Sequence, residues 1–199
     1  GTRVPVVINV PTDYNTIQAA LTTANATDTV LVQPGTYTEN IIWPETNGIK
    51  LISAGDSSNT IIDGGGVSSV IYMNPQSATI DTTTLIQGFK ITNGGNVSSG
   101  GGFYINNASP KIIDLIVSDN VTYNGGGGGI YVSNSNLILK NVTVRNNIAD
   151  GDPSGNNNLG RGGGILIEVG SIPSLTNITV SDNAANFGGG IYQVFDSPS

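Results

Sequence analysis

The stretch GGGGGIY at Gly125–Tyr131 decides the fold, because shorter copies of it recur along the chain. The copies are GGGFY at Gly100–Tyr104, GGGIL at Gly162–Leu166 and GGGIY at Gly188–Tyr192. Counted from the residue after the last glycine, successive copies are 27, 35 and 26 residues apart. A repeat of this length with β-type residues is typical of a solenoid, in which each turn of the chain stacks on the one before it.

A second series of short apolar segments recurs at similar intervals, of 26, 27 and 36 residues. Its members are FKIT at Phe89–Thr92, LIVS at Leu115–Ser118, VTVR at Val142–Arg145 and ITVS at Ile178–Ser181. Because side chains alternate between the two faces of a strand, the first and third residues of each segment are expected to point inward. The pattern predicts strands about 4.8 Å apart, with ladders of like apolar residues forming one continuous core.

A pair of turn-forming residues follows each of these segments: Asn93-Gly94, Asp119-Asn120, Asn146-Asn147 and Asp182-Asn183. A polar side chain repeated at a corner can hydrogen-bond to its copy one coil away and satisfy the backbone of the turn. We therefore interpret this column as structural rather than catalytic.

The N-terminal residues are expected to close one end of the solenoid. Val4–Val10 is a β-branched run that predicts an entry strand. A short amphipathic helix follows, with Asn15 as its cap and Gln18 completing a capping box; its apolar stripe is Ile17, Ala20, Leu21 and Ala24. So short a helix is stable only against another surface. We assign residues 10–25 to a capping segment and residues 28–199 to the coils of a single domain.

Several more strands are predicted before the first glycine run: Thr29–Gln33, Tyr37–Trp43, Ile49–Ser53, Thr60–Asp63 and Val70–Met73. A turn at Pro34-Gly35 separates the first two. After the last repeat, at Gly188–Phe195, no further coil or capping pattern is visible in the sequence. Because an uncapped end exposes strand edges, we expect this chain to be part of a longer protein or to be covered there by another segment.

Composition narrows the function. The chain of 199 residues has a formal charge of −7, only 11% charged residues, and neither cysteine nor histidine. The acidic balance argues against nucleic acid and anionic membranes as partners. The absence of cysteine and histidine removes disulfides, thiolate sites and the commonest zinc ligand. No apolar run is long enough to insert into a membrane. A glycine-, asparagine- and threonine-rich acidic β protein fits bacterial secreted or cell-surface material.

The chain resembles the pectin lyase-like right-handed parallel β-helix superfamily over nearly its whole length. The residues that carry the resemblance are YNTIQAAL at Tyr14–Leu21, PGTY at Pro34–Tyr37, NTIIDG at Asn59–Gly64 and the glycine-run repeats. The resemblance implies an all-β, right-handed parallel β-helix with a short N-terminal capping α-helix. It does not fix an activity, because the superfamily includes polysaccharide lyases, hydrolases, phage tailspikes and adhesins.

One outward column is a candidate carbohydrate-binding surface. The register that points Ile130 inward points four tyrosines outward, with Leu166 interrupting them: Tyr72, Tyr104, Tyr131 and Tyr192. Glu168 belongs to the next outward column, and Arg161 lies in the turn before Leu166. Aromatic rings at regular spacing suit an elongated glycan. The alternative is that the tyrosines are cross-strand pairs that stabilise the sheet.

Catalytic and metal sites have weaker support. Lyases of the resembling families use a basic residue with acids that hold Ca²⁺, and only Lys90 and Arg161 are expected near a groove. Asp150 and Asp152 are candidate Ca²⁺ ligands, although the spacing of a calcium loop is absent. Asp119 and Asp182 are too far apart in the repeat to form a hydrolase pair.

We therefore expect a non-catalytic extracellular domain that serves adhesion, display or glycan binding, with no cofactor. The open alternatives are a polysaccharide lyase or glycoside hydrolase relative acting on an acidic polysaccharide, and a self-associating structural or fibre protein. The expected partners are a polysaccharide or cell-surface glycan and further domains of the same chain.

Overall fold

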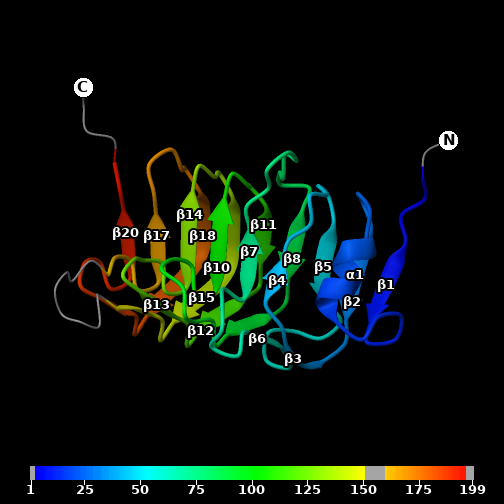
Figure 1. Ribbon diagram of the computed structural model, residues 1–199, viewed down its shortest axis with the longest axis horizontal. Coiled ribbons are helices and arrows are strands. Elements are labelled where there is room, and N and C mark those ends of the chain that lie inside the picture. Colours follow the sequence, from blue (N-terminus) through cyan, green and yellow to red (C-terminus); the bar gives the residue numbers. More distant parts are fainter. Residues whose placement is uncertain (1–2, 151–159, 196–199) are drawn as a thin grey trace.

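The computed structural model describes residues 3–150 and 160–195, and the statements on structure below concern these residues. The chain winds through stacked parallel strands, with helix α1 (Ile17–Thr23) at the N-terminal end (Figure 1). The fold is the right-handed parallel β-helix that the sequence predicts. Every strand pairing is parallel and joins segments one coil apart, so the repeat in the sequence is the length of one coil, such as 26 or 27 residues, or 36 where a coil is longer.

The largest sheet has 11 strands and forms two sides of the solenoid. The first side contains, in stacking order, β1 (Val7–Val10), β2 (Thr29–Val32), β5 (Lys50–Ser53), β8 (Leu85–Gln87), β11 (Lys111–Ile113) and the first halves of β15 (Ile138–Arg145) and β18 (Ser174–Ser181). The second side contains β3 (Gly35–Thr38), β6 (Thr60–Asp63), β9 (Lys90–Thr92), β12 (Ile116–Ser118) and the second halves of β15 and β18.

Two smaller sheets complete each coil. The six-stranded sheet contains β4 (Ile41–Ile42), β7 (Ile71–Met73), β10 (Phe103–Asn106), β14 (Ile130–Ser133), β17 (Ile165–Ile167) and β20 (Ile191–Gln193). These strands lie side by side along the length of the molecule (Figure 1). The three-stranded sheet contains β13 (Val121–Tyr123), β16 (Ile148–Asp150) and β19 (Ala184–Ala185). None of these three strands is predicted from the sequence.

The core consists of the expected inward ladders. Phe89 and Ile91 are fully buried, and so are Val117 and Val144, which occupy the same column in later coils. The alternate residues point outward: Lys90 between Phe89 and Ile91, and Thr143 directly before Val144. Val180 is only partly buried, because it belongs to the last described coil and has no neighbour on one side.

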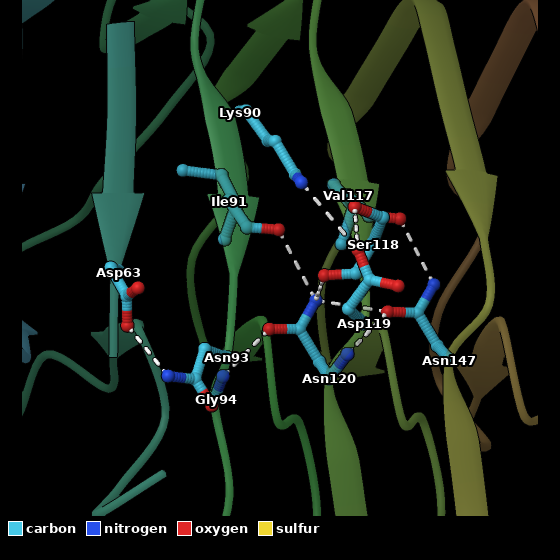
Figure 2. Close-up of polar contacts among 10 residues, drawn as sticks. All are labelled: Asp63, Lys90, Ile91, Asn93, Gly94, Val117, Ser118, Asp119, Asn120 and Asn147. Atoms are coloured by element: carbon cyan, nitrogen blue, oxygen red, sulfur yellow. Dashed lines mark hydrogen bonds and ion pairs between the residues drawn. The ribbon is translucent and has the colours of Figure 1, made fainter. Parts of the chain in front are cut away.

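A column of buried asparagine side chains forms one corner (Figure 2). The side chain of Asn120 donates to Oδ1 of Asn147 at 2.9 Å, and that of Asn147 donates to Oδ1 of Asn183 at 3.0 Å. The backbone N–H groups of Asn120 and Asn147 donate to the same two oxygens. The residue before each of them has a left-handed φ, such as 61° at Asp119 and 55° at Asn146. The structural role predicted for this column is confirmed.

The glycine runs bring neighbouring coils into direct backbone contact. A Cβ on Gly102, Gly129 or Gly164 would lie 2.6–2.7 Å from a carbonyl oxygen of the next coil. Real Cβ atoms do not approach oxygens so closely, so this column excludes every side chain. The glycines are therefore required by stacking.

Helix α1 is held differently from the prediction. Its cap is Thr16, whose side chain accepts from the backbone N–H of Ala19 at 3.1 Å, so the assignment of Asn15 as the cap is wrong. Glu39, from the first coil, accepts from the N–H groups of Ile17 and Gln18 at 2.8 and 2.9 Å. A carboxylate is favoured there because unpaired N–H groups point out of a helix N-terminus.

Gln18 does not complete a capping box either. Its amide accepts from the N–H of Ile42 and donates to the carbonyl of Ile42, at 2.7 and 3.1 Å. Ile42 belongs to β4, the edge strand of the six-stranded sheet, so Gln18 occupies the place of a neighbouring strand there. The predicted strand Tyr37–Trp43 is in fact two strands, β3 and β4, because Glu39 and Asn40 turn the chain between them.

Candidate functional site

The tyrosine column lies on the outer face of the six-stranded sheet. Tyr72, Tyr104, Tyr131, Leu166 and Tyr192 are register partners on successive strands, as the sequence predicts. All four tyrosines are partly exposed, whereas Leu166 is only 3% exposed. We call the surface formed by Tyr72, Tyr104 and Tyr131, with the side chains around them, the tyrosine face.

The three tyrosines of this face form one continuous stack. The ring centroids of Tyr72 and Tyr104 are 4.8 Å apart with an interplanar angle of 13°, and those of Tyr104 and Tyr131 are 5.0 Å apart at 18°. Tyr104 therefore has an aromatic neighbour on both sides. Such cross-strand pairs are the alternative to glycan contact that the sequence analysis gives for this column. The stack leaves non-aromatic neighbours only beyond Tyr72 and Tyr131, its two end rings.

Burial keeps the phenol hydroxyls of Tyr104 and Tyr131 in the protonated form at neutral pH. Burial raises the pKa of Tyr104 above its ordinary value of 10.0, and the two neighbouring tyrosines raise it further. Burial also raises the pKa of Tyr131, with the charge of Glu168 adding to the effect. The hydroxyl of Tyr72 accepts from the side chain of Asn74 at 3.0 Å. The stack thus presents hydroxyl groups that can both donate and accept.

A column of asparagine amides runs beside the stack. The side chain of Asn106 donates to Oδ1 of Asn74 at 3.0 Å, and that of Asn134 donates to Oδ1 of Asn106 at 3.4 Å. These bonds fix the amides in one orientation along the solenoid axis. The tyrosine face is therefore a rigid surface of ring edges, hydroxyls and amides.

A hollow of about 700 Å³ adjoins the Tyr72 end of the stack. Its polar lining includes Gln18, Asn74, Gln76 and Glu45. Glu45 accepts from the backbone N–H groups of three successive residues, Gln76 to Ala78, at 2.7–3.1 Å. These bonds lower the pKa of Glu45 to about 2, so the group is ionised at neutral pH. We call this space the Tyr72 hollow.

A smaller hollow, of about 210 Å³, adjoins Tyr131 at the other end of the stack and is called the Tyr131 hollow. It is lined by Ser99, Asn124, Arg161, Leu166 and Glu168 as well as Tyr131. The structure therefore brings two of the predicted site residues, Arg161 and Glu168, to the tyrosine face. Leu166 lies under the glycine loop, since a Cβ on Gly126 would be 2.5 Å from its Cδ2.

Tyr192 is separated from the stack by Leu166. Its ring is covered instead by the guanidinium of Arg161, whose Cζ lies 5.6 Å from the ring centroid. This cation–π contact holds Arg161 at the boundary between the Tyr131 hollow and the last coil. Tyr192 thus positions Arg161 and does not extend the aromatic row.

The remaining candidates lie elsewhere. Asp150 ends β16 of the three-stranded sheet, and Asp152 lies outside the described residues. Lys90 points from the second side of the large sheet, where its Nζ is 3.5 Å from Asp119 (Figure 2), so its expected place near the groove is wrong. In residues 3–150 and 160–195, no cluster of three acidic side chains that could hold a metal ion is found.

The two hollows escaped the sequence analysis. The lining of the Tyr72 hollow comes from the helix, from β4 and from loops that do not repeat, such as Pro44–Glu45 and Asn74–Gln76. The Tyr131 hollow is lined by the loops before β10, β14 and β17, and the sequence analysis names Arg161 and Glu168 there without predicting the hollow itself. A usable signal did exist at one end, because the insertion that lengthens one repeat lies directly before Arg161.

Comparisons with family models, with curated proteins and with solved structures gave no match to this chain. Among the described residues, the one helix has seven residues, and it is neither long nor apolar enough to cross a membrane.

Proposed function

We propose that this β-helix binds a glycan chain along its tyrosine face without cleaving it, as a domain of a secreted or cell-surface protein. The observation that carries the proposal is the stack of Tyr72, Tyr104 and Tyr131 with a hollow at each end that contains hydrogen-bonding side chains. Carbohydrate sites combine apolar ring contact with a few fixed hydrogen-bonding groups, and both are present on this surface.

The stack suggests how a glycan would lie. The chain would run parallel to the solenoid axis, with its hydroxyls over the tyrosine hydroxyls and the asparagine amides. Sugar rings would enter the hollows at Tyr72 and Tyr131, because each of these rings has an aromatic neighbour on one side only. Tyr104, stacked on both sides, would contribute its hydroxyl and ring edge.

The state of the acids on this face favours binding over hydrolysis. A glycoside hydrolase needs one carboxyl group with a raised pKa as the general acid, close to a second carboxylate. The pKa of Glu45 is instead lowered to about 2, and its oxygens are occupied by backbone N–H groups. Glu168 lies at the opposite end of the stack, in the Tyr131 hollow.

The secreted or surface location and the kinship with the pectin lyase-like superfamily are parts of this proposal. Their support is the β-helix fold, the absence of cysteine and the low content of charged residues. That kinship also supplies the competing function, cleavage of an acidic polysaccharide, which the experiment below distinguishes.

Binding is tested by affinity electrophoresis through gels that contain xylan, mixed-linkage β-glucan, galactan or polygalacturonate. We expect at least one polysaccharide to retard the protein. In the double variant Tyr72→Ala/Tyr131→Ala the affinity should fall roughly tenfold, because two ring contacts of about 0.5–1.5 kcal/mol each are lost.

The matched control is Tyr123→Ala, since Tyr123 is an exposed tyrosine in β13, outside the tyrosine face. It should bind as the unchanged protein does. The proposal fails if none of the four polysaccharides retards the protein, or if Tyr123→Ala weakens binding as much as the double variant. Release of unsaturated or reducing ends from any of the polysaccharides, with or without Ca²⁺, would replace binding by catalysis.

A further inference from the structure

Another hollow of about 700 Å³ lies on the first side of the large sheet, away from the tyrosine face. Its lining includes Ala26, Thr27, Lys50, Thr83, Leu85 and Lys111. We call it the lysine hollow. Its volume is in the range of small-molecule sites, about 300–1,000 Å³.

The floor of this hollow is set by strand register. Lys50 of β5, Leu85 of β8 and Lys111 of β11 are direct neighbours in one outward column. Adjacent strands are about 4.8 Å apart, so the two lysine backbones are separated by roughly 10 Å with Leu85 between them. Side chains as long as lysine can converge over Leu85 from both sides. The result is an apolar floor with an ammonium group at each end.

This acidic chain places most of its lysines on one side. The chain has a formal charge of −7, yet three of its four lysines, Lys50, Lys111 and Lys140, lie on this side of the large sheet. The fourth, Lys90, is paired with Asp119. Over residues 3–150 and 160–195, neither Lys50 nor Lys111 has an ion-pair partner.

The acids beside the hollow are already engaged by other groups. Asp28, which follows Thr27, is buried and accepts two hydrogen bonds from Arg3. Asp81 accepts from the backbone N–H of Thr83 and from its hydroxyl. Neither acid forms an ion pair with Lys50 or Lys111, so both ammonium groups are free to bind an anion from solution.

The wall of the hollow contains an unusual backbone conformation. Thr27 has a φ of 74°, in the left-handed region that a β-branched residue rarely adopts. Its N–H donates to the carbonyl of Gly48, which holds the two wall loops together. Such conformations cost on the order of 1–3 kcal/mol and concentrate at functional sites.

We propose that the lysine hollow binds a small organic anion with an apolar body. Its acidic group lies between the ammonium groups of Lys50 and Lys111, and its apolar part rests on Leu85 and Ala26. The site is independent of glycan binding, because none of its lining residues belongs to the tyrosine face.

The test uses phthalate, an aromatic dicarboxylate, with inorganic phosphate as the comparison probe. Titration calorimetry should show saturable binding of phthalate that weakens with added salt. Amide chemical shifts should move at Thr27 and Leu85. Lys50→Gln and Lys111→Gln should each weaken binding about tenfold, the effect of one lost charged contact.

Lys140→Gln is the matched control, because Lys140 lies on the same side of the sheet but outside the hollow. It should leave phthalate binding unchanged. Absence of saturable phthalate binding, or equal weakening by Lys140→Gln, would overturn the proposal. If phosphate bound as tightly as phthalate, the proposed contact between an apolar body and Leu85 and Ala26 would be overturned. None of these outcomes alters the tyrosine-face experiment.

Discussion

The N-terminal and C-terminal coils satisfy the backbone of their turns with different side chains. In the N-terminal half, carboxylates accept most of these bonds: Asp28 accepts from two backbone N–H groups, and Glu39 and Glu45 accept from two and three. Asn47 and Asn59 accept from one each. In the C-terminal half, the amides of Asn120, Asn147 and Asn183 take this role.

The difference follows from what each group can do. An ionised carboxylate only accepts hydrogen bonds, and two of them side by side repel each other. An amide both accepts and donates, so it can stack on its own copy in the next coil. Asparagine can therefore recur at the same position in successive coils, whereas each carboxylate stabilises a single turn. The four predictions below test this contrast, from the largest expected effect to the smallest.

Replacing Gly129 by alanine should give the largest loss. Its Cβ would lie 2.7 Å from the carbonyl oxygen of Gly164 in the next coil, so two coils must separate. We expect a loss of about 3 kcal/mol or more in the free energy of unfolding, measured by urea denaturation. Gly190→Ala is the control, because the atom nearest to its Cβ would be Cγ1 of the Val180 side chain, at 3.3 Å. Equal losses in the two variants would show that coil contact is not the cause.

Asn147→Ala should remove the middle of the amide column. It leaves the backbone N–H of Asn120 without its acceptor and removes the donor that the Asn147 side chain supplies to the carbonyl of Val117. The expected cost is about 2–3 kcal/mol in the free energy of unfolding. Asn146→Gly changes the exposed neighbour, whose φ of 55° glycine also adopts, and should cost less than about 0.5 kcal/mol. If Asn147→Ala lowered the free energy of unfolding no more than Asn146→Gly does, the structural role of the column would be contradicted.

Asp28→Asn should weaken the N-terminal half. The carboxylate is buried, and Arg3 and two backbone N–H groups donate to it, so an amide group in its place would face donors. We expect a loss of about 2 kcal/mol in thermal or urea unfolding. Asp182→Asn, at an exposed corner of the C-terminal half, should have almost no effect. A larger effect at Asp182 would reverse the contrast between the halves.

Acid should destabilise the carboxylate half selectively. The pKa of Glu45 in the folded protein is about 2, below its ordinary value of 4.5, so its contribution is present above pH 4.5 and is lost as the pH falls toward 2. The urea midpoint should decline over this window, and less so in Glu45→Gln. Backbone hydrogen exchange, corrected for its intrinsic pH dependence, should increase at Gln76–Ala78 and not at Asn147. An equal increase in hydrogen exchange in both halves would argue against separate stabilisation by carboxylates in one half and amides in the other.

The sequence predicts those features of the structure that recur from one coil to the next. The glycine runs, the inward Val and Ile ladders, the asparagine corner and the register of Tyr72, Tyr104 and Tyr131 all follow from one spacing, because stacked coils need like residues at like positions. The three-stranded sheet was not predicted, because its strands are too short to give a clear pattern. Val121 and Ile148, which pair in it, are nevertheless 27 residues apart, as in the other repeats.

Features that occur once could not be found in this way. Glu39 caps a helix 21 and 22 residues before it, Gln18 completes the edge of β4, and Leu166 folds under a glycine loop. Each depends on a contact between non-repeating segments, so no spacing reveals it. The stacking of the tyrosine rings was equally hidden, because periodicity places the side chains in a column without fixing how their rings turn.

The amide columns also give the molecule an internal polarity. In the buried column, each asparagine side chain donates toward the C-terminal end, from Asn120 to Asn147 to Asn183. On the surface the direction is opposite, from Asn134 to Asn106 to Asn74. Bonds aligned in a chain polarise one another, and two opposed chains cancel much of their combined dipole. A duplicated coil inserted into this solenoid would therefore lengthen both columns without changing the direction of either.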